Sequence, residues 1–230
     1  MKFSEELRME TAHIWQANLN HPFVKGIGDG TLPLENFRYY VMQDAYYLSH
    51  FAKVQSLGAA KANDFETTNQ MAAHAQGTYE AESALHRTFF QSLGVTAADI
   101  AVFKPAPTAY AYTSHLYRAA YEGHLGDIIA VILPCYWIYH EIGEHLQACT
   151  PEEVIYQKWI AAYGGEWFKK SVDEQINRLD EIAETVTAKD LTRMKEHFII
   201  SCKYEYAFWE MAYTLEKWPG EIAVAKGMEQ

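Results

Sequence analysis

The sequence predicts an all-α fold. Apolar residues recur at every third or fourth position along most of the 230 residues, whereas alternating segments bounded by turn signals, which would indicate strands, are missing. With 49% hydrophobic residues, the chain can bury a sizeable core. We therefore expect a single domain over residues 1–230, built as a helical bundle of about eight helices.

The first two helices are separated by residues that usually break helices. Ser4 is a plausible cap for the first helix, which carries Trp15 on its apolar side. The segment 21–30 contains one proline and three glycines, and should end this helix. Thr31 and Pro33 then open a long second helix, because proline near the first helical position costs no backbone hydrogen bond.

The third and fourth helices flank the most proline-rich linker of the chain. Asn63 or Asp64 caps the third helix, which should stop at Gly94. The linker ends at Lys104-Pro-Ala-Pro107, and a fourth helix from Thr108 should end at 123–126. We interpret the linker as a loop within one domain, because each half alone would leave apolar helix faces uncovered.

The fifth helix contains a cysteine on its buried side. Its apolar positions follow helical spacing: Ile128, Val131, Ile132, Cys135, Ile138, Tyr139, Ile142 and Leu146. Cys135 therefore points inward. Pro134 lies in the helix interior, where it removes a backbone donor, so we expect a bend beside the thiol.

Three more helices complete the expected bundle. Thr150-Pro-Glu-Glu153 resembles a capping box, so the sixth helix should begin there and stop at 164–165. The seventh should run from Glu166 to about Glu184, and the eighth, capped near Thr187, to about residue 217. We expect the last ten residues to form a short tail.

Composition and charge exclude several classes of function. Nineteen basic and thirty acidic residues give a formal net charge of −11, which argues against nucleic acid or an anionic membrane surface as a partner. The N-terminal residues turn acidic before any signal peptide could form, and no uninterrupted apolar run reaches about 18 residues. Three cysteines at unrelated spacings suit reduced thiols. These observations predict a cytoplasmic protein.

Two carboxylates occupy apolar helix faces. Asp44 lies between Val41 and Tyr47 on the stripe of the second helix, and Glu205 lies between Cys202 and Phe208 on that of the eighth. Burying an unpaired carboxylate costs several kcal/mol, so such acids usually have a partner or a function. One interpretation is that each accepts hydrogen bonds from a neighbouring tyrosine or backbone group. The other is that both face a pocket.

The residues around these acids suggest what such a pocket would bind. Cys135 and Tyr139 share one helix face, and further aromatic side chains are available from Tyr47, Tyr112, Tyr163 and Phe208. No lysine or arginine lies on these stripes, so phosphate or carboxylate ligands are disfavoured. Stacking faces, carboxylates and a thiol would suit a flat, nitrogen-containing ring that is neutral or cationic.

The pattern gives little support for a metal. His140 and His145 are five residues apart, one too many for the zinc motif His-Glu-x-x-His. The Glu-x-x-His spacing of di-iron bundles occurs once, at Glu10 and His13. We therefore expect no metal and no cofactor. Packing is the simplest role for the other helical histidines, although a cysteine–histidine pair with one of them stays open: His50, His74, His86 and His115.

Seven segments together resemble the TenA family, the thiaminase II or aminopyrimidine aminohydrolase enzymes. They span nearly the whole chain: 21–33 (HPFVKGIGDGTLP), 39–48 (YYVMQDAYYL), 74–82 (HAQGTYEAE), 107–115 (PTAYAYTSH), 133–146 (LPCYWIYHEIGEHL), 163–167 (YGGEW) and 204–209 (YEYAFW). The resemblance implies a haem-oxygenase-like fold without haem, and a homotetramer.

The resemblance also implies roles for the residues of the site. Cys135 would be the nucleophile and Glu205 the acid that engages a ring nitrogen of the pyrimidine. Asp44 would bind the substrate and position the thiol, while Tyr47 would make the thiol more nucleophilic. The remaining aromatic residues would line the ring: Tyr112, Tyr139, Tyr163 and Phe208.

The activity implied is hydrolysis of 4-amino-5-aminomethyl-2-methylpyrimidine to hydroxymethylpyrimidine, in thiamine salvage, together with cleavage of thiamine. Two other functions stay open at this point. The same pocket could serve a non-catalytic carrier or regulatory protein that binds a pyrimidine. The fold implied also resembles that of cofactor-building oxidases such as PQQ synthase.

Overall fold

The computed structural model describes residues 1–220, including all side chains except those of 81–83, 85 and 86. Every regular element of this part is a helix, which confirms the predicted all-α class. The expected tail, 221–230, lies outside the described residues, as does the side chain of His86.

The helices are α1 (Phe3–Glu10), α2 (Ala12–Leu19), α3 (Pro22–Asp29), α4 (Leu34–Lys61), α5 (Phe65–Ser92), α6 (Ala97–Val102), α7 (Pro107–Glu122), α8 (Leu125–Leu146), α9 (Val154–Tyr163), α10 (Glu166–Ala183) and α11 (Ala188–Thr214).

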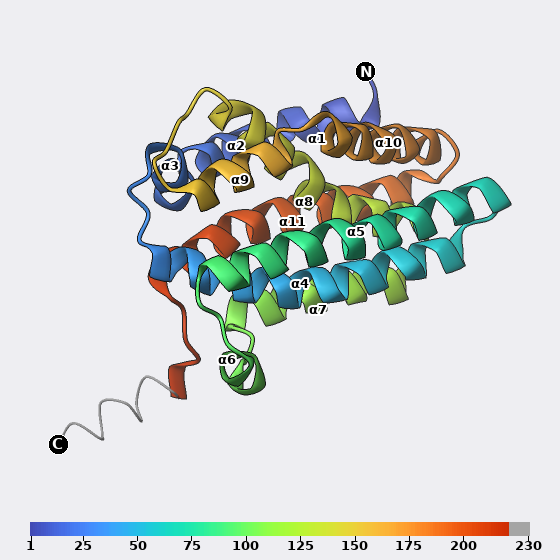
Figure 1. Cartoon of the computed structure of the whole chain (residues 1–230). Coiled ribbons are helices and arrows are strands. Elements are labelled where there is room, and N and C mark those ends of the chain that lie inside the picture. The colour runs from blue at the N-terminus through green and yellow to red at the C-terminus, as the bar shows by residue number, and fades with distance from the viewer. Residues whose placement is uncertain (221–230) are drawn as a thin grey trace.

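Helix α8 is the centre of the bundle. It contacts α2, α4, α7, α9, α10 and α11. Figure 1 shows α4 and α5 side by side as a long antiparallel pair, with α10 and α1 across the bundle from them. Helix α8 continues through Pro134 without a break, and places Cys135 next to Tyr136 in the middle of the bundle.

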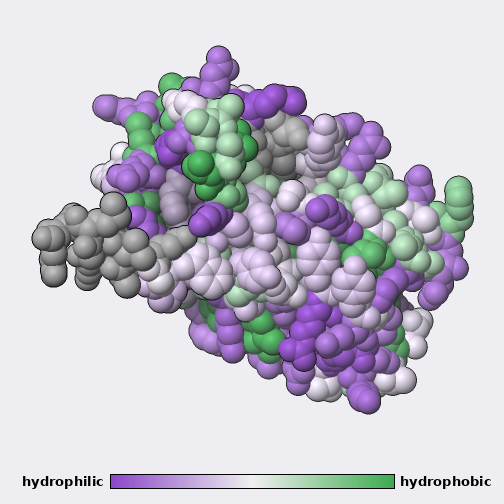
Figure 2. All heavy atoms as spheres, turned by 90° about the horizontal axis from the view of Figure 1, so that it is seen from below, coloured by the Kyte–Doolittle hydropathy of each residue, from purple (hydrophilic) through white to green (hydrophobic). Residues whose placement is uncertain are grey.

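Helix α8 is also the one described helix that is long and apolar enough to cross a membrane by length and composition. The apolar runs in the sequence did not suggest this. However, 83% of its most apolar window is buried within the fold, which identifies it as a core helix. The face of the molecule seen in Figure 2 is largely hydrophilic or weakly polar, with hydrophobic residues in small patches.

The described residues contain eleven helices instead of about eight, because one expected helix is divided in two and two segments that were interpreted as breaks form helices. The first expected helix is divided at Thr11 into α1 and α2. The segment 21–30 was predicted wrongly as irregular, and forms α3. Pro22 is compatible with a helix there because it lies in the first turn, and Gly30, with φ +77°, ends the helix. The Pro-rich linker contains α6, capped by Thr96 and Asp99.

Two predicted helix starts are also wrong. Ser4 does not cap α1. Its backbone N–H and its hydroxyl both donate to the carboxylate of Asp180, at 2.8 Å each, so it ties α1 to α10. Helix α9 begins at Val154, because Pro151 is buried against the turn at Gly30 and the chain turns into the helix only after it.

Candidate active site

A cavity of about 450 Å³ opens between α4, α5, α8 and α10, and the end of α9 contributes to its wall. Such a volume is typical of small-molecule sites. The residues that line it are Asp44, Leu48, Phe51, Glu66, Asn69, Gln70, Ala73, His74, Gly77, Thr78, Cys135, Tyr136, Tyr139, Tyr163, Trp167, Phe168, Lys170, Ser171 and Glu174.

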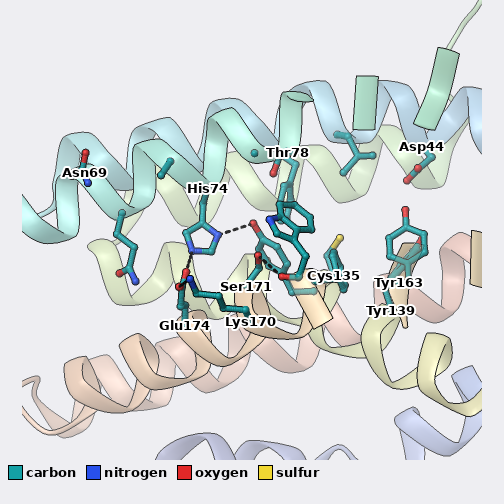
Figure 3. A pocket seen from close by; sticks show the side chains of 18 of the residues that line it. Asp44, Asn69, His74, Thr78, Cys135, Tyr139, Tyr163, Lys170, Ser171 and Glu174 are labelled. Atoms are coloured by element: carbon teal, nitrogen blue, oxygen red, sulfur yellow. Dashed lines mark hydrogen bonds and ion pairs between the residues drawn. The ribbon is translucent and has the colours of Figure 1, made fainter. Parts of the chain in front are cut away.

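Four of the eight site residues expected from the sequence line this cavity at one end. Figure 3 shows Asp44, Cys135, Tyr139 and Tyr163 together there. Cys135 is partly exposed, whereas Asp44 is 5% exposed. The ring centroids of Tyr139 and Tyr163 are 4.9 Å apart, with the rings edge to face. A thiol, a carboxylate and two phenol rings thus meet at this end, which we call the inner end.

The other four expected residues form a second layer behind the inner end. Glu205, Tyr47, Tyr112 and Phe208 are each at most 3% exposed. The hydroxyl of Tyr112 donates a hydrogen bond to Glu205 Oε1. The ring of Tyr47 lies 4.8 Å from that of Tyr112 and 5.7 Å from that of Phe208, measured between centroids. Cys135 and Asp44 therefore line the cavity directly, whereas Glu205 lies one layer deeper.

Glu205 is a neutral acid at pH 7. Burial raises its pKa to about 8, the negative charge of Asp44 adds to this, and the hydrogen bond from Tyr112 only partly opposes it. The sequence allowed that a neighbouring tyrosine donates a hydrogen bond to this buried acid, and Tyr112 does so at Oε1. The carboxyl nevertheless keeps a proton that it can donate.

Tyr47 brings a poorly satisfied polar atom to the same place. Its hydroxyl is buried, and its interaction with the Tyr112 hydroxyl falls short of ordinary hydrogen-bond geometry. Its pKa is raised well above the usual range, first by burial and then by the neighbouring Cys135, Tyr112 and Glu205. Leaving such a group unpaired costs about 1–3 kcal/mol, a cost that a bound polar ligand would remove.

The sequence did not reveal the part of the cavity that lies away from Cys135, which we call the outer half. Its walls come from α5 and α10 and include His74, Lys170, Ser171 and Glu174 (Figure 3). The α5 residues involved are mostly polar or small and recur at helical spacing, a pattern that usually marks a solvent-facing side. Lys170 also adds a basic residue to the cavity wall, whereas the apolar stripes contain no lysine or arginine.

The near-match to a zinc motif has a structural role instead. His140 is buried and its Nδ1 lies 3.1 Å from the carbonyl oxygen of Tyr163, whereas His145 is exposed. Gln147 Nε2 donates to the carbonyl oxygen of Gly164 at 2.7 Å. Among the side chains that the structure describes, no three or more of His, Cys, Asp or Glu group closely enough to hold a metal. His140 and Gln147 thus hold the turn that carries Tyr163.

Gly143 allows this turn to approach α8, so Gly143→Ala should disturb the inner end. A Cβ there would lie 2.4 Å from the amide nitrogen of Gly164 and 2.5 Å from the carbonyl carbon of Tyr163, so the backbone must move. We expect a loss of about 1–3 kcal/mol in stability. Displacement of Tyr163 should also lower kcat/KM by roughly tenfold or more.

Denaturant unfolding and steady-state kinetics check this prediction. Gly220→Ala is the control, because a Cβ there meets no atom within 4 Å. An unchanged unfolding midpoint and unchanged kinetics for Gly143→Ala would show that the turn does not depend on this close approach.

Comparison with known proteins gives matches over nearly the whole chain. Residues 8–215 match the TENA/THI-4/PQQC family. The chain is 58% identical over 218 residues to the aminopyrimidine aminohydrolase of Bacillus subtilis (strain 168), covering 95% of this chain and 92% of that protein.

Solved structures agree with the fold. A TenA homologue from P. horikoshii OT3 is 27% identical, with a TM-score of 0.86 over 93% of this chain and 99% of that one. A domain with a heme oxygenase-like fold from Shewanella denitrificans OS217 is 18% identical, covers 91% of each chain and has a TM-score of 0.72, which confirms that fold class. Since the family match covers nearly the whole described bundle, this chain belongs to the TENA/THI-4/PQQC family.

Proposed function

We propose that this chain is an aminopyrimidine aminohydrolase. It hydrolyses 4-amino-5-aminomethyl-2-methylpyrimidine to hydroxymethylpyrimidine, and cleaves thiamine by the same chemistry. The observation that carries the proposal is a partly exposed thiol, Cys135, at the end of an aromatic-walled cavity, with the protonated Glu205 one layer behind it. The name of the Bacillus subtilis relative points to the same reaction.

Glu205 starts the reaction as an acid. It donates its proton, or a hydrogen bond, to a ring nitrogen of the pyrimidine and so makes the adjacent ring carbon electrophilic. Its raised pKa supports this role, since a carboxyl with the usual value would already be ionised at pH 7. The pyrimidine ring must then extend past Asp44 toward the second layer, where the Tyr47 hydroxyl interacts only weakly with Tyr112.

Cys135 supplies the nucleophile. Its sulfur adds to the activated ring carbon, and the ring electrons then expel the leaving group from the exocyclic methylene. The leaving group is ammonia for the aminomethyl substrate, whose amine leaves in its protonated form, and the neutral thiazole for thiamine. Water adds to the methylene, and the thiolate departs as the aromatic ring is restored. Asp44 positions the thiol and accepts its proton, and Tyr47, which stays protonated because its pKa is raised, donates a hydrogen bond to the thiolate. Both effects offset the cost of forming a thiolate in a buried site.

The aromatic residues orient the ring. Tyr139 and Tyr163 contact it from the open cavity, and Tyr112 and Phe208 limit its depth from behind. The proposal further includes a role in thiamine salvage, a homotetramer, a cytoplasmic location, and activity without metal, cofactor or nucleic acid.

The test is hydrolysis of the two substrates by the wild-type protein. We expect turnover of both, with kcat/KM higher for the aminomethyl pyrimidine than for thiamine. Turnover of neither would contradict the enzyme proposal and favour a binding protein. Oxygen consumption or bound iron would favour an oxidase instead.

A further inference from the structure

The outer half of the cavity is lined by a buried histidine, His74, that has no role in the chemical steps of the proposed reaction. His74 is 8% exposed, and both of its ring nitrogens have partners. Nδ1 lies 3.3 Å from the hydroxyl oxygen of Tyr136, and Nε2 lies 3.1 Å from Oε2 of Glu174. Figure 3 shows these two interactions as dashed lines on either side of the imidazole. Gln55, 0% exposed, donates from Nε2 to the same Tyr136 hydroxyl.

The partners determine which nitrogen of neutral His74 carries the proton. The Glu174 carboxylate can only accept, so Nε2 must be the donor. Nδ1 is then an acceptor, and the Tyr136 hydroxyl donates to it. This arrangement connects α4, α5, α8 and α10, the four helices that enclose the cavity.

The position of Tyr136 matters because it directly follows Cys135 on α8 and itself lines the cavity. Its ring is packed between Phe51 and Phe168, with centroids at 5.4 and 5.9 Å. Aromatic contacts of this kind hold the plane of a ring but leave its hydroxyl to hydrogen-bond partners. Those partners include Gln55 and His74.

We propose that His74 is a positioning residue for the proposed reaction: in its uncharged form it holds Tyr136 and Glu174 in place around the outer half of the cavity, and a second proton on the imidazole breaks this arrangement and weakens substrate binding. The inference rests on the proposed function, and adds to it a residue and a pH dependence.

Protonation conflicts with the hydrogen bonds that His74 makes. A cationic imidazole has a donor at both nitrogens, so Nδ1–H and the Gln55 amide would both point at the Tyr136 oxygen. The hydroxyl proton of Tyr136 would then have to leave Nδ1. Gln55 Oε1 is buried and without a hydrogen-bond partner among the described residues, but it could accept that proton only if the amide rotated. The charged state therefore requires rearrangement of the cavity wall.

The charges near His74 set the direction of the pH effect. On α10 these are Glu174 and Lys170, whose Nζ is 3.8 Å from Glu174 Oε1, and on α8 the titratable group is Tyr136. Helix α4 contributes the uncharged Gln55, and α5 contributes Glu66 farther along the cavity. Burial lowers the pKa of His74 below its usual 6.5, while Glu174 partly opposes this. His74 is thus uncharged at neutral pH, and KM should rise as the pH falls through that lowered pKa.

Two substitutions separate hydrogen bonding from packing. His74→Phe keeps a ring of similar size but cannot accept from Tyr136, whereas His74→Asn loses the ring but places an amide oxygen near the position of Nδ1. We expect His74→Phe to raise KM for the aminomethyl pyrimidine roughly tenfold with little change in kcat. His74→Asn should keep KM within about threefold, and KM should no longer rise in acid. A benign His74→Phe together with a damaging His74→Asn would show a packing role and overturn the proposal.

An NMR measurement makes the test independent of turnover. Imidazole nitrogen shifts of the wild type should show the Nε2–H tautomer of uncharged His74 at pH 7, and Tyr136→Phe should raise the pKa of His74 by removing a donor to its neutral form. A charged His74 at pH 7, or a pKa unaffected by Tyr136→Phe, would refute the inference. A wild type that turns over no pyrimidine would refute the proposed function instead, and the NMR result would still decide the role of His74.

Discussion

Cys135→Ser should lower kcat/KM for the aminomethyl pyrimidine by roughly 10³-fold or more, because a serine hydroxyl in place of the thiol is a far weaker nucleophile at neutral pH. Thiamine cleavage should fall in parallel, since both substrates require the same addition to the ring. Substrate binding, measured by calorimetry, should change little, because the two side chains are close in size.

Cys149→Ser is the matched control. Cys149 is also partly exposed, but its sulfur lies near Gly28 and not on the cavity. This variant should keep wild-type kinetics. If Cys135→Ser keeps a tenth or more of wild-type turnover, the thiol is not the nucleophile, and a mechanism with direct attack by water must be considered.

Glu205→Gln should reduce kcat/KM by roughly 10²–10⁴-fold, because the amide can donate a hydrogen bond to the ring nitrogen but cannot transfer a proton. The pH profile gives a second readout. Since the acid acts in its protonated form, wild-type kcat/KM should fall as the pH rises through about 8, the pKa of the buried carboxyl. That decline should be absent from the residual activity of the variant.

Stability measurements distinguish this loss from misfolding. In the folded chain Glu205 keeps its proton up to about pH 8, whereas in the unfolded chain it loses the proton near 4.5. Folding is therefore penalised increasingly as the pH rises from 4.5 to 8. Glutamine avoids this penalty, so at pH 7 the variant should unfold at no lower denaturant concentration than the wild type. Glu196→Gln, at an exposed position of α11, should change neither property. Full activity in Glu205→Gln would contradict the assigned role.

Helical periodicity was sufficient to predict that two carboxylates face the interior of the bundle. Asp44 and Glu205 interrupt apolar stripes on α4 and α11, and in the structure both are buried. The period of a helix places a residue on a face whatever the exact boundaries are. For the same reason the errors at α3 and α6 did not affect the expected site, although glycine and proline had been interpreted as breaks.

The outer half could not be found in this way. Its α5 wall contains Asn69, His74 and Thr78, which look like part of a solvent-facing side when α5 is considered alone. Only the packing of α10 against α8, which brings Glu174 across from His74, makes this side an interior wall. The second layer needed tertiary structure too, because no local pattern shows that Tyr112 donates to Glu205.

Helix α11 packs against α1, α2, α3, α4, α7 and α8, and this has a consequence for synthesis. A ribosome releases the N-terminal helices long before residue 188, yet the main contacts of α3 are with α2 and with α11. Phe23, Val24 and Ile27 of α3, each 0% exposed in the bundle, therefore cannot be fully buried until α11 emerges. The helix that then covers them also carries Glu205, so a nascent chain completes its core and gains its proposed proton donor in the same step.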